Sequence, residues 1–89
     1  MRCVISVLGK DQTGIVAAVS NVLLECKANI DDISQTIIGG LFSMTMLVTL
    51  DTNTADFDTV LDKLTAEGER LGVQITFQRE DVFDYMYKI

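Results

Sequence analysis

Histidine is absent from this 89-residue sequence, and with it the side chain most often used as a general base or metal ligand near neutral pH. Without it there is no Ser–His or Cys–His pair, and no metal-ligand constellation is evident. Two clustered carboxylates could do acid–base work, but nothing else lines a reaction site. We therefore expect no catalytic residues, no metal, no cofactor and no enzymatic activity.

Cysteine and basic residues are also scarce. The two cysteines, Cys3 and Cys26, fall within apolar patterns, which favours buried free thiols over a disulfide or a metal pair. Seven Lys and Arg stand against thirteen Asp and Glu, giving a net charge of −6. Such a chain is repelled by nucleic acid and by anionic membranes, so we expect neither as a direct partner. No apolar run approaches a membrane span and no leader pattern is evident, so the expected location is cytoplasmic.

The apolar content of 48% predicts a folded chain with one modest core, a single domain over residues 1–89. Alternation predicts a strand over Cys3–Leu8, and helical spacing predicts a helix from about Thr13, its N-cap, to Cys26. Lys27 should complement the dipole of that helix, and Asn29 should end it in the left-handed conformation.

The second half of the chain repeats this pattern with a hairpin inserted. Strands over Ile30–Ile38 and Leu41–Leu50 flank Gly39-Gly40, a type I′ hairpin signal. A second helix should begin at Asn53 or Thr54 and end at Gly72, followed by a strand to Arg79. Residues 81–89 have the spacing of a short third helix. The predicted fold is α+β: a ferredoxin-like βαββαβ sandwich with two helices on one face of a four-stranded antiparallel sheet.

Two segments stand out as a candidate site. Gly9-Lys10-Asp11-Gln12-Thr13-Gly14-Ile15-Val16 leaves a strand and enters a helix, whose N-terminal amides can hold a carboxylate. Asn29-Ile30-Asp31-Asp32-Ile33 opens the next strand with an amide and two carboxylates, which suit an ammonium group. An anion-binding turn beside a cation-binding edge indicates a receptor for a small zwitterion.

The same segments, in this order of elements, resemble the ACT domain. The resemblance covers nearly the whole chain and is closest to small free-standing bacterial ACT proteins and to glycine-cleavage repressor-type modules. The sequence departs from the family at Gln12-Thr13, where a proline is common, and at Lys27-Ala28, where a glycine usually precedes the asparagine. The resemblance implies a non-enzymatic regulatory module that binds an amino acid or similar molecule at a homodimer interface. The predicted ligand-binding residues are Asp11, Gln12, Thr13, Gly14, Ile15, Asn29, Ile30, Asp31 and Gln35.

Each of these residues also has a purely structural interpretation. Gly14 could allow close helix–sheet packing, Asp11 could stabilise its turn, and Asn29 could simply stop a helix. Asp31 and Asp32 should point to opposite sides of their strand, and Gln35, if buried, needs a hydrogen-bond partner. The alternative function is a ligand-free dimerisation module that binds a protein partner. Dimerisation should cover either the helix-free face of the sheet or the edge of its second strand.

Overall fold

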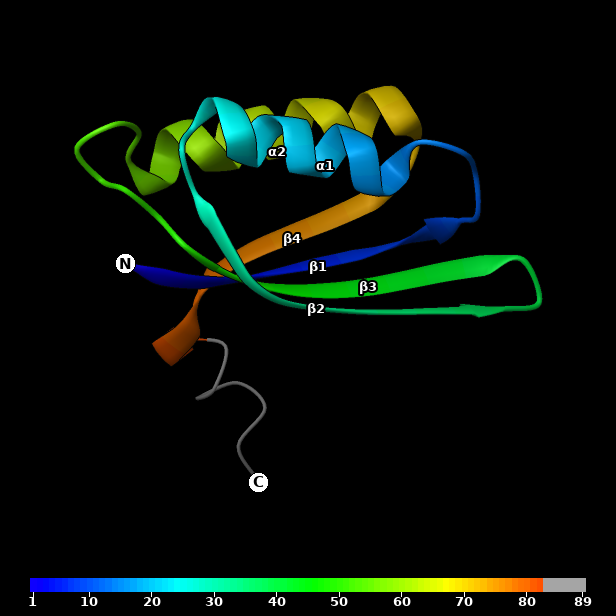
Figure 1. The fold of residues 1–89 in the computed structure, drawn as a ribbon. Coiled ribbons are helices and arrows are strands. Elements are labelled where there is room, and N and C mark those ends of the chain that lie inside the picture. The colour runs from blue at the N-terminus through cyan, green and yellow to red at the C-terminus, as the bar shows by residue number, and fades with distance from the viewer. Residues whose placement is uncertain (83–89) are drawn as a thin grey trace.

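A computed structural model describes residues 1–82 and shows a four-stranded antiparallel sheet with both helices on one face (Figure 1). In chain order the elements are β1 (Arg2–Lys10), α1 (Ile15–Glu25), β2 (Asn29–Ile38), β3 (Leu41–Thr49), α2 (Phe57–Leu71) and β4 (Gln74–Arg79). The strands lie in the order β2-β3-β1-β4, so β2 and β4 are the edges. The predicted ferredoxin-like sandwich is confirmed.

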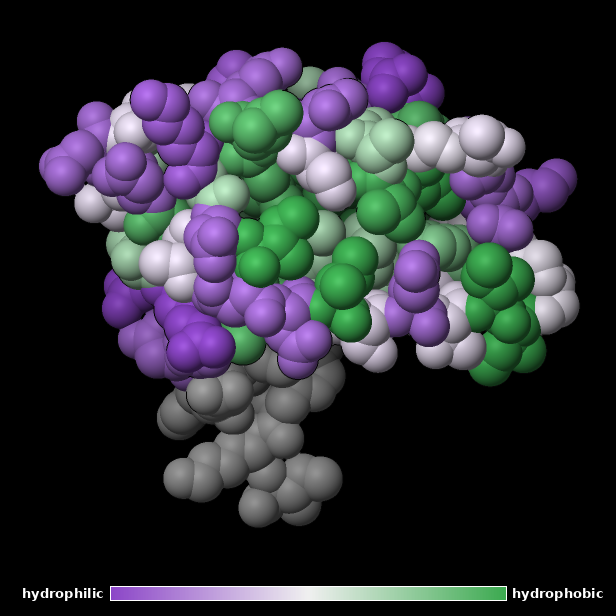
Figure 2. Space-filling model, in the orientation of Figure 1, coloured by the Kyte–Doolittle hydropathy of each residue, from purple (hydrophilic) through white to green (hydrophobic). Residues whose placement is uncertain are grey.

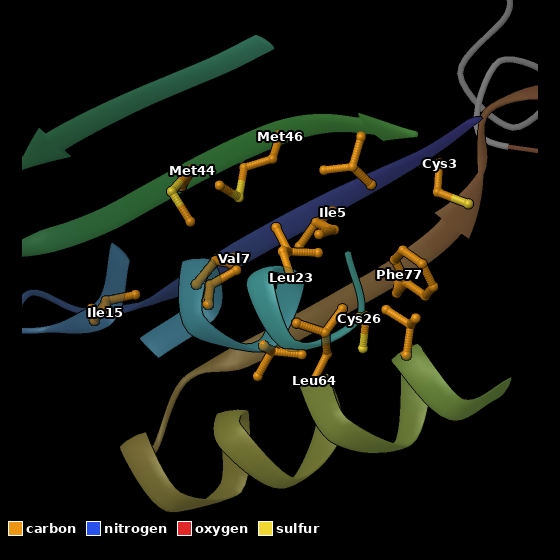
Figure 3. Close-up of a cluster of buried hydrophobic side chains, with 14 of the residues drawn as sticks. Cys3, Ile5, Val7, Ile15, Leu23, Cys26, Met44, Met46, Leu64 and Phe77 are labelled. Atoms are coloured by element: carbon orange, nitrogen blue, oxygen red, sulfur yellow. The ribbon is translucent and has the colours of Figure 1, made fainter. Parts of the chain in front are cut away.

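The core lies between the sheet and the two helices (Figure 3). Alternate residues of β1 and β3 point into it, and α1 and α2 close it from above with residues at helical spacing. Its best-buried side chains are Cys3, Ile5, Val7, Ile15, Val19, Leu23, Met44, Met46, Val48, Val60 and Leu64. Phe57 and Phe77 stack with ring centroids 4.6 Å apart, which joins the start of α2 to β4.

The helix ends differ from the prediction in three places. Gly14, at φ 94°, precedes α1 and no side chain caps that helix, so Thr13 is not its N-cap. Lys27, at φ 55°, takes the left-handed conformation after α1, while Asn29 is already in β2. The Ala28 and Lys27 amides donate to the carbonyls of Leu23 and Leu24, which is the Schellman arrangement. Lys27 therefore lies beyond the last turn of α1.

The start of α2 is the third difference. Asp56, rather than Asn53 or Thr54, is its N-cap, and its carboxylate accepts from the Thr59 amide at 2.9 Å. Asn53 and Thr54 belong to the preceding turn, where both donate to Asp51. The predicted end at Gly72 is confirmed, with φ 72°.

The hairpin Gly39-Gly40 has positive φ at both residues, as predicted for a type I′ turn. β2 carries a bulge between Ile30 and Asp32, so Asp31 is an extra residue without a partner in β3. The strict alternation expected for Asp31 and Asp32 therefore does not hold at this point. The predicted helix over 81–89 lies almost wholly outside the described residues, of which 80–82 are helical.

The helix-free face of the sheet carries Val4, Leu8, Leu41 and Leu47, as expected from the register. Leu8 and Leu41 are about half exposed, whereas Val4 is buried. Residues 80–82 turn toward this side of the sheet (Figure 1). The face is therefore only partly open, whereas every residue of the edge strand β2 is exposed.

Candidate functional site

The β1–α1 loop forms the first half of the candidate site. The Asp11 amide donates to the Gly40 carbonyl at 2.8 Å, and the Gln12 amide group donates to the Leu71 carbonyl at 2.6 Å. The loop is thus tied to the β2–β3 hairpin on one side and to the C-terminal end of α2 on the other. The prediction that Gln12 contacts a ligand stays a prediction, and in the structure its side chain also bonds the C-terminal end of α2. It acts as a support for the loop.

Gly14 supplies the conformation with which this loop enters α1. Its φ of 94° disfavours any residue with a Cβ, and an added Cβ would meet no atom within 4 Å. Close packing of helix on sheet therefore does not explain this glycine. Gly68 of α2 has that role, since a Cβ there would lie 3.2 Å from the Ile75 side chain of β4. The space in front of the N-terminus of α1 is open.

The electrostatics of this helix end differ from those of α2. In α2 the N-cap Asp56 and the first-turn Asp58 both place negative charge at the N-terminus. In α1 no side chain caps the end and the first turn holds no acidic residue. Thr13 is exposed, and Ile15 is buried in the core, so Ile15 can offer only its backbone to a ligand. The N-terminus of α1 therefore has no negative charge of its own to complement its dipole, and a bound anion could supply it.

The start of β2 forms the second half, and its polar groups are bonded to one another. The Asn29 side-chain amide donates to Asp31 Oδ1 at 2.6 Å, and Thr49 Oγ1 donates to Asp31 Oδ2 at 2.5 Å. Arg2 Nε lies 3.7 Å from Asp31 Oδ2. The Thr49 and Asn29 hydrogen bonds, with a smaller contribution from Arg2, hold the pKa of Asp31 below its usual value. The Asp31 carboxylate therefore links the side chains of Asn29 and Thr49 through hydrogen bonds.

Sequence reasoning missed a hollow beside this cluster. A depression of about 440 Å³ lies between the second half of α1 and the start of β2. It is lined by Ser20, Asn21, Leu23, Leu24, Ala28, Asn29 and Ile30. The residues from α1 gave no sequence signal, because Ser20 and Asn21 read as an ordinary solvated helix face. Only the turn after α1 brings them beside Asn29.

The two halves of the predicted site do not meet within one chain. The β1–α1 loop lies beside the hairpin, whereas Asn29 lies at the opposite end of α1 (Figure 1). The eleven residues of α1 correspond to a separation of about 16 Å. Gln35 lies midway along β2. Because its side chain is exposed, water can satisfy its hydrogen bonds and no protein or ligand partner is required.

Comparison with known proteins identifies the family. A model described as the ACT domain matches residues 2–78. The chain belongs to the ACT domain family. ACT domains are regulatory modules that bind small molecules. Within this family the chain is 53% identical over 88 residues to a UPF0237 protein of Methanocaldococcus jannaschii, covering 99% of this chain and 98% of that protein.

Two solved structures extend the comparison. An ACT domain protein from Streptococcus pneumoniae is 41% identical, with a TM-score of 0.80 and 98% of each chain covered. A putative glycine cleavage system transcriptional repressor is 23% identical, with a TM-score of 0.75 over 86% of this chain and 44% of that one. The second likeness shows a shared fold. Relatives of matching length thus include proteins from outside the bacteria as well as bacterial ones.

The described part of this ACT domain offers little for catalysis. Cys3 and Cys26 are free and buried, and burial raises the pKa of both thiols, which makes them poor nucleophiles. Within residues 1–82 no group of three or more Cys, Asp or Glu could hold a metal ion. No helix in the same range has the length and apolar character to cross a bilayer.

Proposed function

We propose that this protein is a non-enzymatic regulatory module that works as a homodimer and binds an amino acid or a similar small zwitterion between its two copies. The observation that supports this proposal most directly is that the candidate site is divided into two separate halves. Its anion-binding and cation-binding halves lie at opposite ends of α1, so a single chain presents each half without the other. With two free, buried thiols, a reducing and hence cytoplasmic location fits the same proposal.

The edge strand β2 is the surface that supports a dimer. Every residue of β2 is exposed, and an edge strand presents unpaired backbone donors and acceptors. Ile33 and Ile37 pair with Met46 and Phe42, which are core residues, so their side chains share the helix side of the sheet. Leu24, near the C-terminal end of α1, is 74% exposed and lines the hollow with Ile30 of β2. Hydrophobic side chains gather on this face, where α1 and β2 lie (Figure 2).

A two-fold axis through the middle of β2 would complete the site. Two antiparallel β2 strands would place the Asn29 end of each copy beside the hairpin end of the other. Because the β1–α1 loop is bonded to that hairpin through Gly40, the N-terminus of α1 from one copy would face Asn29 of the second. The pairing is isologous, so the dimer would hold two equivalent sites.

Charge determines the orientation of the ligand in this arrangement. The uncapped N-terminus of α1 favours a carboxylate, and the start of β2, with Asp31 and Asp32, favours an ammonium group. The hollow lined by Leu24, Ala28 and Ile30 would then take the side chain of the ligand. This distribution matches an α-amino acid.

Replacing Ile37 by Lys is expected to convert the dimer to a monomer. The new charge would be desolvated against the second copy, which costs far more than on the free edge. Leu8→Lys is the matched control, because Leu8 is similarly exposed but lies on the helix-free face. Sedimentation velocity at micromolar concentration should give monomeric Ile37→Lys and dimeric Leu8→Lys. The reverse pattern would move the interface to the helix-free face.

A thermal-shift screen with the common amino acids tests the ligand. An amino acid at 100 times its Kd should stabilise the folded state by about 2.7 kcal/mol, and a domain of this size gains about 4–8 °C in Tm per kcal/mol. The same exposed edge also favours a second candidate, a ligand-free assembly module that binds a protein. A stable dimer whose Tm no amino acid raises would favour that second function over the first.

A further inference from the structure

The helix-free face of the sheet is buried at one end and open at the other. Val4 and Leu8 of β1 both lie on this face, yet Val4 is 6% exposed and Leu8 is 47% exposed. Val4 pairs with Gln78 near the end of β4, and Leu8 pairs with Gln74 at its start. The exposed apolar side chains of the face therefore gather toward the β2–β3 hairpin, and they are Leu8, Ile38 and Leu41.

The chain leaves β4 on this same face. Arg2 lies there, because the next residue of β1, Cys3, points into the core. Arg2 Nε is 3.7 Å from Glu80 Oε2, and it is equally far from Asp31 Oδ2 of β2. These contacts place the first residue after β4 on the helix-free side, where residues 80–82 form a helical turn (Figure 1). The segment 83–89 therefore starts from the buried end of the face.

A row of hydroxyl side chains crosses the middle of the face. Ser6 pairs with Thr45 and with Thr76, and Thr45 pairs with Ser34, so each of the four strands contributes one hydroxyl. These side chains are shorter than the leucines in the rows on either side, so an aromatic ring can approach the sheet there. A tyrosine suits such a row, because its ring is apolar and its hydroxyl can bond to Ser and Thr.

The aromatic residues of the chain fall into two groups. The three within residues 1–82 lie in the core or pack against it from the helix side, and they are Phe42, Phe57 and Phe77. The other three fall within 83–89, and they are Phe83, Tyr85 and Tyr87. Seven residues reach about 10 Å as a helix or about 23 Å as an extended chain, and the hydroxyl row lies about 7 Å from Val4 along β1. The segment is therefore long enough to reach the row.

We propose that residues 83–89 dock on the helix-free face of their own chain, with their aromatic side chains on the row of hydroxyls. A segment attached at the edge of the face has a high effective concentration there, which favours it over a second copy or another protein. The cover continues the burial of Val4 toward Leu8. It leaves the β2 edge free for the second copy, and it does not require a ligand.

NMR of the full-length protein tests this docking. NOEs should join the methyl groups of Val4, Leu8 and Leu47 to ring protons of residues 83–89, and ring currents should shift these methyl signals upfield. Both effects should be lost in the combined variant Phe83→Ser, Tyr85→Ser and Tyr87→Ser. Phe57→Leu is the matched control, because it removes a ring from the helix side and should leave these methyl signals unchanged.

A sample that mixes ¹³C-labelled with unlabelled chains identifies the source of the rings. NOEs within one chain are the expected result. NOEs only between chains would mean that the segment of a second copy covers the face, which overturns docking on the same chain. Methyl signals without ring NOEs, and unchanged in the triple serine variant, would show that these rings do not cover the face. None of these outcomes depends on amino-acid binding or on the β2 dimer, so the proposed function can fail separately.

Discussion

Gly14→Asp is expected to weaken amino-acid binding by at least about 100-fold while leaving the fold intact. The new carboxylate would stand at the N-terminus of α1, in the open space where the ligand carboxylate is proposed to bind. Hydrogen bonds to a charged group are worth about 1.5–3 kcal/mol each, so losing two of them at this helix end accounts for the change. Isothermal titration calorimetry, with circular dichroism to verify the helices, would measure it.

Two controls separate charge from backbone strain. Asn tolerates positive φ about as well as Asp, so Gly14→Asn should bind more tightly than Gly14→Asp by about tenfold or more. Gln12→Ala removes the bond to the Leu71 carbonyl and should cost about 0.5–1.5 kcal/mol of stability with little loss of affinity. Equal affinities for Gly14→Asp and wild type would show that the ligand carboxylate does not bind at the N-terminus of α1.

Leu23→Ala and Leu64→Ala are each expected to lower the free energy of unfolding by about 2–5 kcal/mol. Leu23 on α1 and Leu64 on α2 are almost fully buried and lie in the same cluster against the sheet (Figure 3). Truncation removes contacts that the neighbouring strands cannot recover by collapsing. Urea unfolding at one fixed protein concentration would measure it, since a dimer makes apparent stability depend on concentration.

Leu61 provides the graded comparison on the same helix. The helical spacing of Leu61, Leu64 and Leu71 predicts a place for Leu61 in the core, but the structure leaves it only partly buried at the margin. Leu61→Ala should therefore cost clearly less than Leu64→Ala. Similar losses for the two would mean that the assigned faces of α2 are incorrect.

The sheet and both helix faces were predictable because their patterns repeat. Phe42, Met44, Met46 and Val48 occupy alternate positions of β3, and all four are buried. Gly39-Gly40 and Gly72 have few alternative uses, because positive φ excludes most other residues. Each of these patterns involves only residues that are close in sequence, so it could be interpreted without knowing how the chain packs.

The helix ends were harder because several residue types can serve there. Lys27 takes a left-handed position where glycine is usual, so no residue type marked this helix end and Asn29 appeared to be the better candidate. At the start of α2 three residues of capping type, Asn53, Thr54 and Asp56, stand within four positions. Which of them caps depends on where Asp51 closes the preceding turn, a competition that spacing alone does not resolve.

The sequence allowed candidate site residues to be named, but it did not show how the fold places them relative to one another. The loop before α1 and the start of β2 could be located along the chain, yet one sequence cannot show that α1 holds them apart. The bulge at Asp31 also had no signal, because an extra residue in a strand changes no composition. Both features depend on how strands pair, and the proposed role of each residue follows from that pairing.

Mixing two defective variants tests the shared site most directly. Gly14→Asp damages one half and Asn29→Ala the other, so each homodimer should lose binding. After subunit exchange, a mixed dimer carries one intact site and one doubly altered site. Random exchange should therefore restore about a quarter of the wild-type sites, at wild-type affinity, in a calorimetric titration. No recovery in a mixture shown by mass spectrometry to contain mixed dimers would contradict a site built from two copies.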